Sequence, residues 1–195
     1  DVDVRVVVTR TLPGGYSYRG GISKYEQIKR DLDLWLCERT AENDRFTTMI
    51  DLYRLPRDFP GWSQCLVTDD PYERVARLEK RLGEDVDSPR FVPYIQLHEF
   101  EALILADPCR LTDAFPDEAD AVQRLVCLAE GFPTPEHIDE GDETAPSKRI
   151  FAEIPDYKER KASAGPMVAE SIGLACLRAR CTHFGEWLGK LEALR

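Results

Sequence analysis

The sequence lacks any apolar run near the roughly 20 residues that a membrane-spanning helix needs. No such run is longer than the five residues from Ala102 to Ala106, and no signal-peptide pattern is present. We therefore expect a cytoplasmic protein without membrane contacts. A basic excess is also missing, because 36 acidic residues outnumber 26 basic ones and give a net charge of −10. Binding of nucleic acid through the whole surface is not expected, whereas local basic patches stay open.

Motifs for metal, nucleotide and nucleophile sites are equally scarce. None of the six cysteines forms a Cys-x2-Cys pair, so free thiols in a reducing compartment are favoured over zinc or disulfides. Gly15 and Gly20 have the spacing of a phosphate-binding P-loop, but Gly21 stands where its lysine belongs. Of the three histidines, only His98 lies near other candidate groups, and no Ser-His-Asp triad can be assembled.

The hydrophobic pattern is that of a globular α/β protein. With 43% hydrophobic residues, a chain of this length buries about 70% of the surface that it exposes when unfolded. Strands and helices alternate in the first half, which is typical of a layered α/β fold with a small, mostly parallel sheet. We predict strands at residues 4–9, 46–53 and 91–97, and helices at residues 23–38, 71–82 and 99–105. We expect a single domain over residues 1–195, with residues 108–195 as its helical extension.

Acidic residues cluster where predicted strands end. Asp51 lies near the end of the strand at residues 46–53, and His98, Glu99 and Glu101 follow the strand at residues 91–97. Ligands of α/β sheets bind at the carboxyl ends of strands, and carboxylates are what Mg²⁺ or Mn²⁺ uses. The alternatives are a helix cap or salt bridge for Asp51, and first-turn acids that complement a helix dipole for Glu99 and Glu101.

Basic residues stand at two loops. Arg19 and Lys24 accompany the glycine-rich segment 13–21, and Lys148 and Arg149 follow Pro146 at a predicted helix start. Such positions suit a phosphate oxygen or a developing negative charge. The alternatives are a flexible surface connection at residues 13–21, and a solvated helical turn paired with the acidic residues before it.

Five ordered motifs resemble a bacterial family of unknown function that is grouped with Toprim-like proteins. They lie at residues 19–25 (RGGISKY), 47–61, 94–103 (YIQLHEFEAL), 143–150 (ETAPSKRI) and 172–188. The resemblance implies a Toprim-like α/β fold and Mg²⁺- or Mn²⁺-dependent cleavage of DNA or RNA phosphodiesters. Related Toprim proteins of the overcoming-lysogenization-defect class are nucleases that work with an ATPase. Members of the family are often encoded beside an AAA-type ATPase, which implies a partner and a role in phage or mobile-element defence.

The motifs assign a role to each candidate residue. Asp51 corresponds to the acid at the end of the Toprim aspartate strand. The expected metal ligands are Asp51, Glu99 and Glu101; the expected catalytic residues are Glu101, Lys148 and His98; the expected nucleic-acid contacts are Arg19, Lys24, Ser147 and Arg149.

The sequence departs from the family pattern in two ways. The leading strand that ends in Glu-Gly-x-Thr-Glu and its following helix are absent, and Tyr53 stands where an Asp-x-Asp pair would have its second acid. We therefore expect a chain that lacks the usual N-terminal strand and helix. Two other functions stay open: a non-catalytic regulatory subunit of an ATPase, and a phosphotransferase or phosphohydrolase acting on small nucleotides. Homo-oligomerisation is a further expectation.

Overall fold

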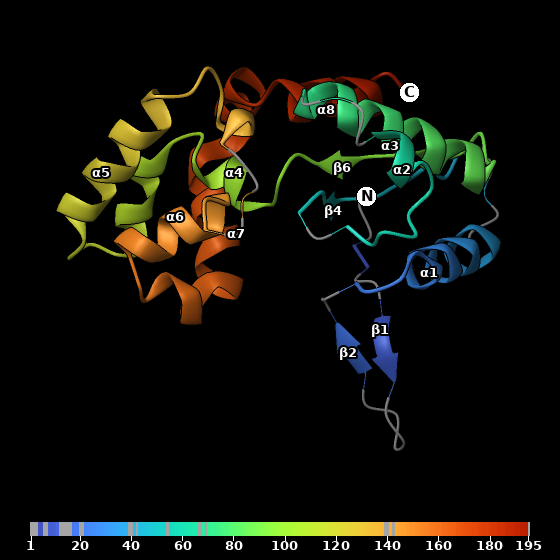
Figure 1. Ribbon diagram of the computed structural model, residues 1–195, viewed down its shortest axis with the longest axis horizontal. Helices are drawn as coiled ribbons and strands as arrows, with labels where there is room; N and C mark the ends of the chain where they lie inside the picture. The colour runs from blue at the N-terminus through green and yellow to red at the C-terminus, as the bar shows by residue number, and fades with distance from the viewer. Residues whose placement is uncertain are drawn as a thin grey trace. The chain divides into compact units, whose positions relative to one another are not determined.

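The computed structural model describes residues 4–5, 8–11, 17–19, 22–38, 41, 43–53, 55–65, 68, 70–138, 141 and 143–194. Over these residues the fold is mixed α/β, as predicted: a small parallel strand pair is flanked by helices, and the C-terminal part is helical (Figure 1). No described helix is both long enough and apolar enough to cross a membrane.

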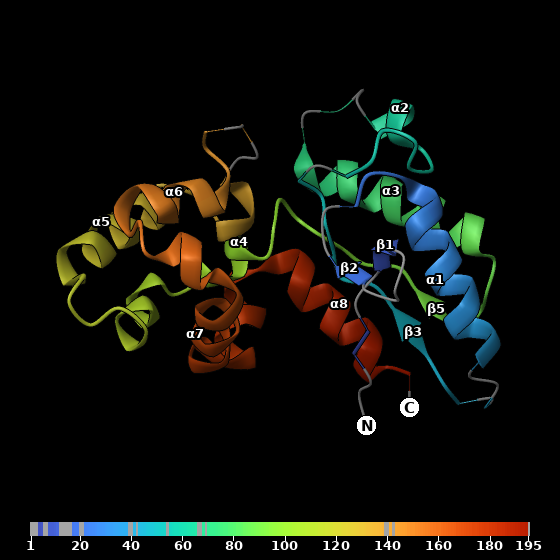
Figure 2. The same ribbon diagram turned by 90° about the horizontal axis from the view of Figure 1, so that it is seen from below.

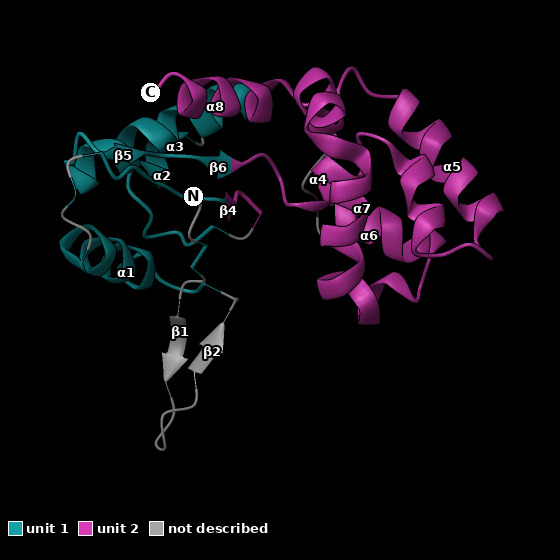
Figure 3. Cartoon of the chain, turned by 180° about the vertical axis from the view of Figure 1, so that it is seen from behind, with its two compact units in different colours: residues 1–49, 54–95 teal, residues 50–53, 96–195 magenta. Residues whose placement is uncertain are grey.

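The chain folds into two compact units (Figure 3). Unit 1 comprises residues 1–49 and 54–95, and unit 2 comprises residues 50–53 and 96–195. The short segment 50–53 therefore belongs to the second unit although the chain around it belongs to the first. That segment carries Asp51. The assignment of residues 1–195 to a single domain stays a prediction.

Unit 1 combines short strands with two long helices. It contains β1 (Val8–Thr11), β2 (Ser17–Arg19), α1 (Tyr25–Glu38), β3 (Phe46–Thr47), α2 (Trp62–Cys65), α3 (Pro71–Val86) and β5 (Phe91–Val92). β3 pairs in parallel with β5, and α3 packs against both β5 and α1 (Figure 2). α3 starts as predicted, because the Asp70 carboxylate accepts a hydrogen bond from the Tyr72 N–H at 2.9 Å and Pro71 occupies the first turn.

The N-terminal predictions fall only partly on described residues. The strand predicted at residues 4–9 overlaps β1 only at Val8 and Thr9, and residues 4–5 are not in a strand. β1 is antiparallel to β2. Strand β2 lies within the segment predicted as a glycine-rich loop, so that part of the prediction is wrong. The remaining residues of that loop, and the side chains of β1 and β2, lie outside what the structure describes.

The long strands predicted at residues 46–53 and 91–97 are wrong in length, since each is a pair of two-residue strands. β3 is followed by β4 (Ile50–Asp51), and β5 is followed by β6 (Ile95–Gln96). Between β3 and β4, the Thr48 hydroxyl donates to the Tyr94 carbonyl at 2.8 Å and accepts from the Tyr94 N–H at 3.2 Å. A side chain thus replaces ladder hydrogen bonds there, and Pro93 has no N–H to donate.

Unit 2 is mostly helical. After β4 it contains α4 (Glu101–Ile104), η1 (Pro108–Asp113), α5 (Ala119–Glu130), η2 (Pro135–His137), α6 (Pro146–Glu153), α7 (Tyr157–Arg180) and α8 (Thr182–Glu192). α4 packs against α6 and α7, and α7 packs against α8. α7 is interrupted at Gly173, which has φ 78° and ψ 152°. This break divides α7 into one helical segment before Gly173 and one after it.

Candidate functional site

Backbone hydrogen bonds hold segment 50–53 beside the chain that leads into α4. The Leu52 N–H donates to the Gln96 carbonyl at 2.9 Å, and the Tyr53 N–H donates to the His98 carbonyl at 2.6 Å. His98 has a φ of 58°, in the left-handed region that non-glycine residues seldom adopt. The chain turns there from β6 into α4, and the turn brings Asp51 next to the start of that helix.

Asp51 receives a backbone hydrogen bond and stands in a field of negative charge. Its Oδ1 accepts from the Phe100 N–H at 3.0 Å. Burial, and then the charges of Glu101 and Glu99, raise the pKa of Asp51 from its usual 3.8 to about 7. The protonated and ionised forms of this carboxyl are therefore both populated near neutral pH. A bound cation would favour the ionised form.

Glu101 has no exposed surface, and both of its oxygens have partners. Oε1 accepts from the Tyr157 hydroxyl at 3.2 Å, and Oε2 accepts from the Lys161 ammonium at 3.0 Å. Burial raises the pKa of Glu101, and Lys161 opposes that shift. Gly165 packs beside the tyrosine, where an added Cβ would lie 3.2 Å from the Tyr157 oxygen. Two helices of unit 2, α4 and α7, therefore fix this carboxylate.

Glu99 connects the same turn to α6. Its Oε1 accepts from the backbone N–H of Ser147, in the first turn of α6. Glu99 is only 3% exposed, and the helix N-terminus supplies both the donor and a favourable dipole. We call Asp51, Glu99 and Glu101 the carboxylate cluster.

Another buried acid repeats this capping arrangement elsewhere in unit 2. Glu136 has no exposed surface, and it accepts from the N–H groups of His183 at 2.9 Å and Phe184 at 3.1 Å, at the start of α8. The backbone carbonyl oxygen of Glu136 lies 2.9 Å from Nε2 of His98. Capping of a helix by a sequence-distant acid is thus a recurrent device of this unit.

Of the residues predicted on α6, Ser147 contacts the cluster through its backbone N–H, whereas the described contacts of Lys148 and Arg149 are with other residues. α6 packs against α4, and Ser147 is buried at its capped end. The Lys148 ammonium lies 5.9 Å from the centre of the Phe151 ring. Arg149 lies over the Phe132 ring at 5.6 Å and donates from Nε to the Thr144 carbonyl at 2.8 Å. Both side chains are half-buried.

The two N-terminal basic residues belong to unit 1. Lys24 is exposed just before α1, where its backbone N–H donates to Oε1 of Gln27 at 3.1 Å. The side chain of Arg19 lies outside the described part of the chain. Their proposed contacts with nucleic acid stay predictions.

Sequence reasoning missed Tyr157 and Lys161, the two residues that contact Glu101. The sequence of α7 does contain a pattern that indicates these two residues. Along α7 the buried positions Tyr157, Ala164 and Val168 recur at helical spacing, and Lys161 falls on the same stripe. A lysine within an otherwise apolar stripe predicts a buried anionic partner, although the pattern cannot identify which acid that is.

The cluster suits a divalent cation in its chemistry but offers few ligands as it stands. Across the described residues, no three His, Cys, Asp or Glu side chains converge to hold a metal ion. However, Mg²⁺ commonly takes only one or two carboxylates from protein, with water and substrate oxygens completing its shell. The repulsion that raises the pKa of Asp51 is one that a cation would relieve. The assignment of Asp51 and Glu101 as ligands of such an ion stays a prediction.

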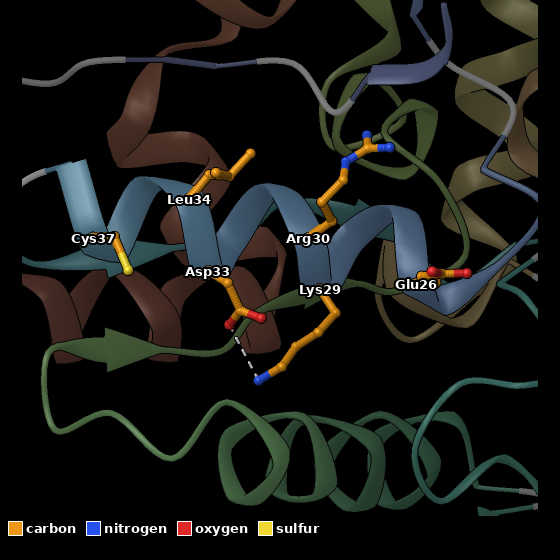
Figure 4. Close-up of a pocket in the computed structure, with 6 residues that line it drawn as sticks. All are labelled: Glu26, Lys29, Arg30, Asp33, Leu34 and Cys37. Atoms are coloured by element: carbon orange, nitrogen blue, oxygen red, sulfur yellow. Dashed lines mark ion pairs between the residues drawn. The ribbon is translucent and has the colours of Figure 1, made fainter.

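A separate hollow of about 430 Å³ lies on α1 in unit 1 (Figure 4). Its described lining includes the ion pair between Lys29 and Asp33, 3.3 Å apart, and the exposed side chain of Leu34. None of the predicted site residues that the structure describes contributes to it. The candidate site of this chain is therefore the carboxylate cluster of unit 2.

Comparison with known proteins gives a family match. A family model described as "Domain of unknown function (DUF4276)" matches residues 3–192, nearly the whole chain. No curated protein matches the chain, and no solved structure matches it.

Proposed function

The chain belongs to the DUF4276 family, and on that premise we propose that it is a nuclease-like hydrolase that cleaves nucleic-acid phosphodiesters with Mg²⁺ or Mn²⁺. The observation that carries this proposal is the carboxylate cluster. The negative charges of Glu101 and Glu99 help to raise the pKa of Asp51. Lys161 is the cation that partners Glu101. Such an excess of buried negative charge is costly to a fold and is typical of sites that bind cations.

In this proposal Asp51 and Glu101 hold the metal ion, and Glu99 fixes α6 beside them through Ser147. A divalent ion in this position supplies Lewis acidity toward a phosphoryl oxygen and lowers the pKa of a bound water. The chain's own residues do the remaining work. Lys148, in the first turn of α6, places positive charge where the phosphate gains negative charge.

The other predicted residues take supporting roles. His98 positions the turn between β6 and α4, because its Nε2 is engaged with the Glu136 carbonyl. Arg19, Lys24, Ser147 and Arg149 remain the proposed contacts with the nucleic-acid backbone. The family resemblance alone supports the wider setting, which is phage or mobile-element defence beside an AAA-type ATPase. A cytoplasmic location and homo-oligomerisation are further parts of the proposal.

Cleavage assays test the proposal. Single- and double-stranded DNA and RNA are incubated with the purified chain and Mn²⁺, then with EDTA. We expect metal-dependent cleavage that Asp51→Asn and Glu101→Gln reduce by at least about a hundredfold, the scale expected when a metal ligand or electrostatic group is removed. Asp117→Asn, at an exposed position, is the matched control and should keep full activity. Absence of cleavage on every substrate, or cleavage indifferent to the two site variants, overturns the proposal.

A second function has its own supporting observation. Each carboxylate of the cluster already accepts a hydrogen bond within the chain, from Phe100, Ser147 or the pair Tyr157 and Lys161. Such a site is self-sufficient as a structural element, which favours a non-catalytic subunit of an ATPase. The net charge of −10 suits docking of a basic partner. Metal-independent co-purification with the ATPase, without cleavage, would identify this function.

A further inference from the structure

The start of α1 is held by a loop from a distant part of unit 1. The Tyr25 N–H donates to Oδ1 of Asp58 at 3.0 Å, so an acid 33 residues away caps the helix. The Tyr25 ring also packs edge-on against Phe59, with 5.2 Å between the ring centres. Lys24 directly precedes Tyr25, and Arg57 directly precedes Asp58. The contact therefore places two basic residues beside each other at the surface.

The backbone that carries Arg57 is fixed on both sides. The Phe59 N–H donates to the Pro56 carbonyl at 3.0 Å, and this hydrogen bond closes a turn with Arg57 and Asp58 at its two central positions. Pro56 and Phe59 are buried, whereas Arg57 and Asp58 are exposed. The turn thus presents the guanidinium to solvent from an anchored backbone, so less conformational entropy is lost when a ligand binds there.

The two basic side chains are available to a ligand. Lys24 and Arg57 are exposed, and within the described part of the chain neither side chain makes a hydrogen bond or an ion pair. The N–H groups of Lys24 and Tyr25 are already occupied, and so is Oδ1 of Asp58. The other acid nearby in the chain, Glu26, lies on the stripe that lines the hollow on α1. An anionic ligand here would therefore bind through the ammonium and guanidinium groups.

We propose that Arg57 and Lys24 form a contact surface for the phosphate backbone of nucleic acid, one that needs no divalent ion. The inference rests on the proposed function, because a phosphodiester hydrolase must hold a phosphate backbone, and it adds Arg57 to the contacts expected from the sequence. A net charge of −10 repels such a backbone over the surface as a whole, so the attraction has to come from local cations. A planar guanidinium can donate two parallel hydrogen bonds to one phosphate, which suits Arg57 to this ligand.

Fluorescence anisotropy in EDTA tests this surface, because binding is then measured apart from metal-dependent cleavage. Labelled DNA and RNA oligonucleotides are titrated with the full chain, with Arg57→Gln and Lys24→Gln, and with the control Lys158→Gln at an exposed position of α7. We expect each of the two surface variants to weaken binding about five- to tenfold. Each should also lower the slope of log K against log salt concentration by about 0.7 to 0.9, the value for one lost phosphate contact. Lys158→Gln should bind as the unaltered chain does.

Two further measurements separate charge from structure. Arg57→Lys keeps the charge without the paired hydrogen bonds, so its affinity should fall between those of the unaltered chain and Arg57→Gln. All the surface variants should unfold at the same urea concentration as the unaltered chain, because the side chains of Arg57 and Lys24 are exposed and make no described hydrogen bond or ion pair. Polyglutamate, titrated in parallel, represents an acidic protein partner.

Each outcome has a distinct meaning. Weaker nucleic-acid binding by Arg57→Gln and Lys24→Gln, with Lys158→Gln unaffected, supports the inference. Nucleic-acid binding that either surface variant leaves unchanged, or that Lys158→Gln weakens equally, overturns it. Absence of nucleic-acid binding by the unaltered chain also overturns it, and binding of polyglutamate alone does so in favour of an acidic protein partner. The proposed function is judged separately, by the cleavage assays with Mn²⁺.

Discussion

Glu101 Oε2 accepts a hydrogen bond at 3.0 Å from Lys161 Nζ, so a fully buried carboxylate is neutralised by a lysine that is 42% exposed. The two partners of this ion pair face different environments. Removal of the lysine leaves a charge in the interior, whereas removal of the acid leaves a charge that solvent can hydrate. The energetic consequences of the two deletions are therefore unequal.

Without added metal at pH 8, Lys161→Met should destabilise the chain more than Glu101→Gln does. We expect the free energy of unfolding to fall by about 2 to 3 kcal/mol in the lysine variant and by about 1 kcal/mol in the glutamate variant. These losses are smaller than those for a fully buried ion pair, because half of the lysine is solvated. Urea unfolding measures both. The double variant should be close to Glu101→Gln alone, since no buried charge then lacks its partner. Equal losses in the two single variants would contradict this explanation.

Asp51 should make the stability of the chain depend on pH. Its pKa is 3.8 in its usual state and about 7 in the fold, so the native state holds more protons than the unfolded state between these values. The stabilisation of the fold that protonated Asp51 provides is thus fully present below about pH 4. It is lost as the pH rises through 7.

Asp51→Asn should remove this dependence, because the amide oxygen can still accept from Phe100 N–H but cannot ionise. At pH 8 we expect the variant to be more stable than the unaltered chain by about 2 to 4 kcal/mol. Urea unfolding at pH 5, 6, 7 and 8 provides the comparison, with the exposed Asp117→Asn as control. A variant that is less stable at pH 8 would show that the Asp51 charge is stabilising instead.

Glu136→Gln should weaken the start of α8 and leave metal binding unchanged. One amide oxygen can replace only one of the two carboxylate oxygens that accept from His183 and Phe184. We expect a loss of about 1 to 3 kcal/mol in the free energy of unfolding. Glu130→Gln, at an exposed position, should have no effect. A change in Mn²⁺ affinity in Glu136→Gln would mean that this cap and the carboxylate cluster are coupled.

Two glycines of the C-terminal helices should respond in opposite ways to alanine. Gly173 has φ 78° and ψ 152°, a conformation that alanine adopts only with strain. Gly189 lies within α8, and an added Cβ there would meet no atom within 4 Å. Thermal unfolding should show a loss of about 1 to 3 kcal/mol for Gly173→Ala and a gain of up to about 1 kcal/mol for Gly189→Ala. A neutral Gly173→Ala would mean that α7 can straighten without cost.

Local sequence signals predicted the helices better than the strands. α3 was predictable because Asp70 and Pro71 mark its start and its apolar residues recur at helical spacing. The break of β3 from β4 was not, because it depends on a contact between Thr48 and Tyr94, 46 residues apart. Side-chain competition with a sheet ladder is visible only once both segments are in place.

In the candidate site too, some residues could be predicted from the sequence and others could not. The acids were recognisable because charged residues at the ends of apolar strands are costly without partners. Their partners were not, since Ser147 lies 48 residues from Glu99 and Lys161 lies 60 residues from Glu101. The hydrogen bond from Phe100 to Asp51 corresponds to the helix cap weighed as an alternative from the sequence. Glu99 instead caps α6, which is not the helix that follows it in the chain. Capping and cation binding are compatible, because Mg²⁺ needs few carboxylates from the protein.

The most direct test of the proposed metal site is anomalous diffraction from crystals of the full chain soaked in Mn²⁺. We predict an anomalous peak in contact with the carboxylates of Asp51 and Glu101. A fully occupied Mn²⁺ ion elsewhere on the chain, or no bound Mn²⁺ at all, would contradict this prediction.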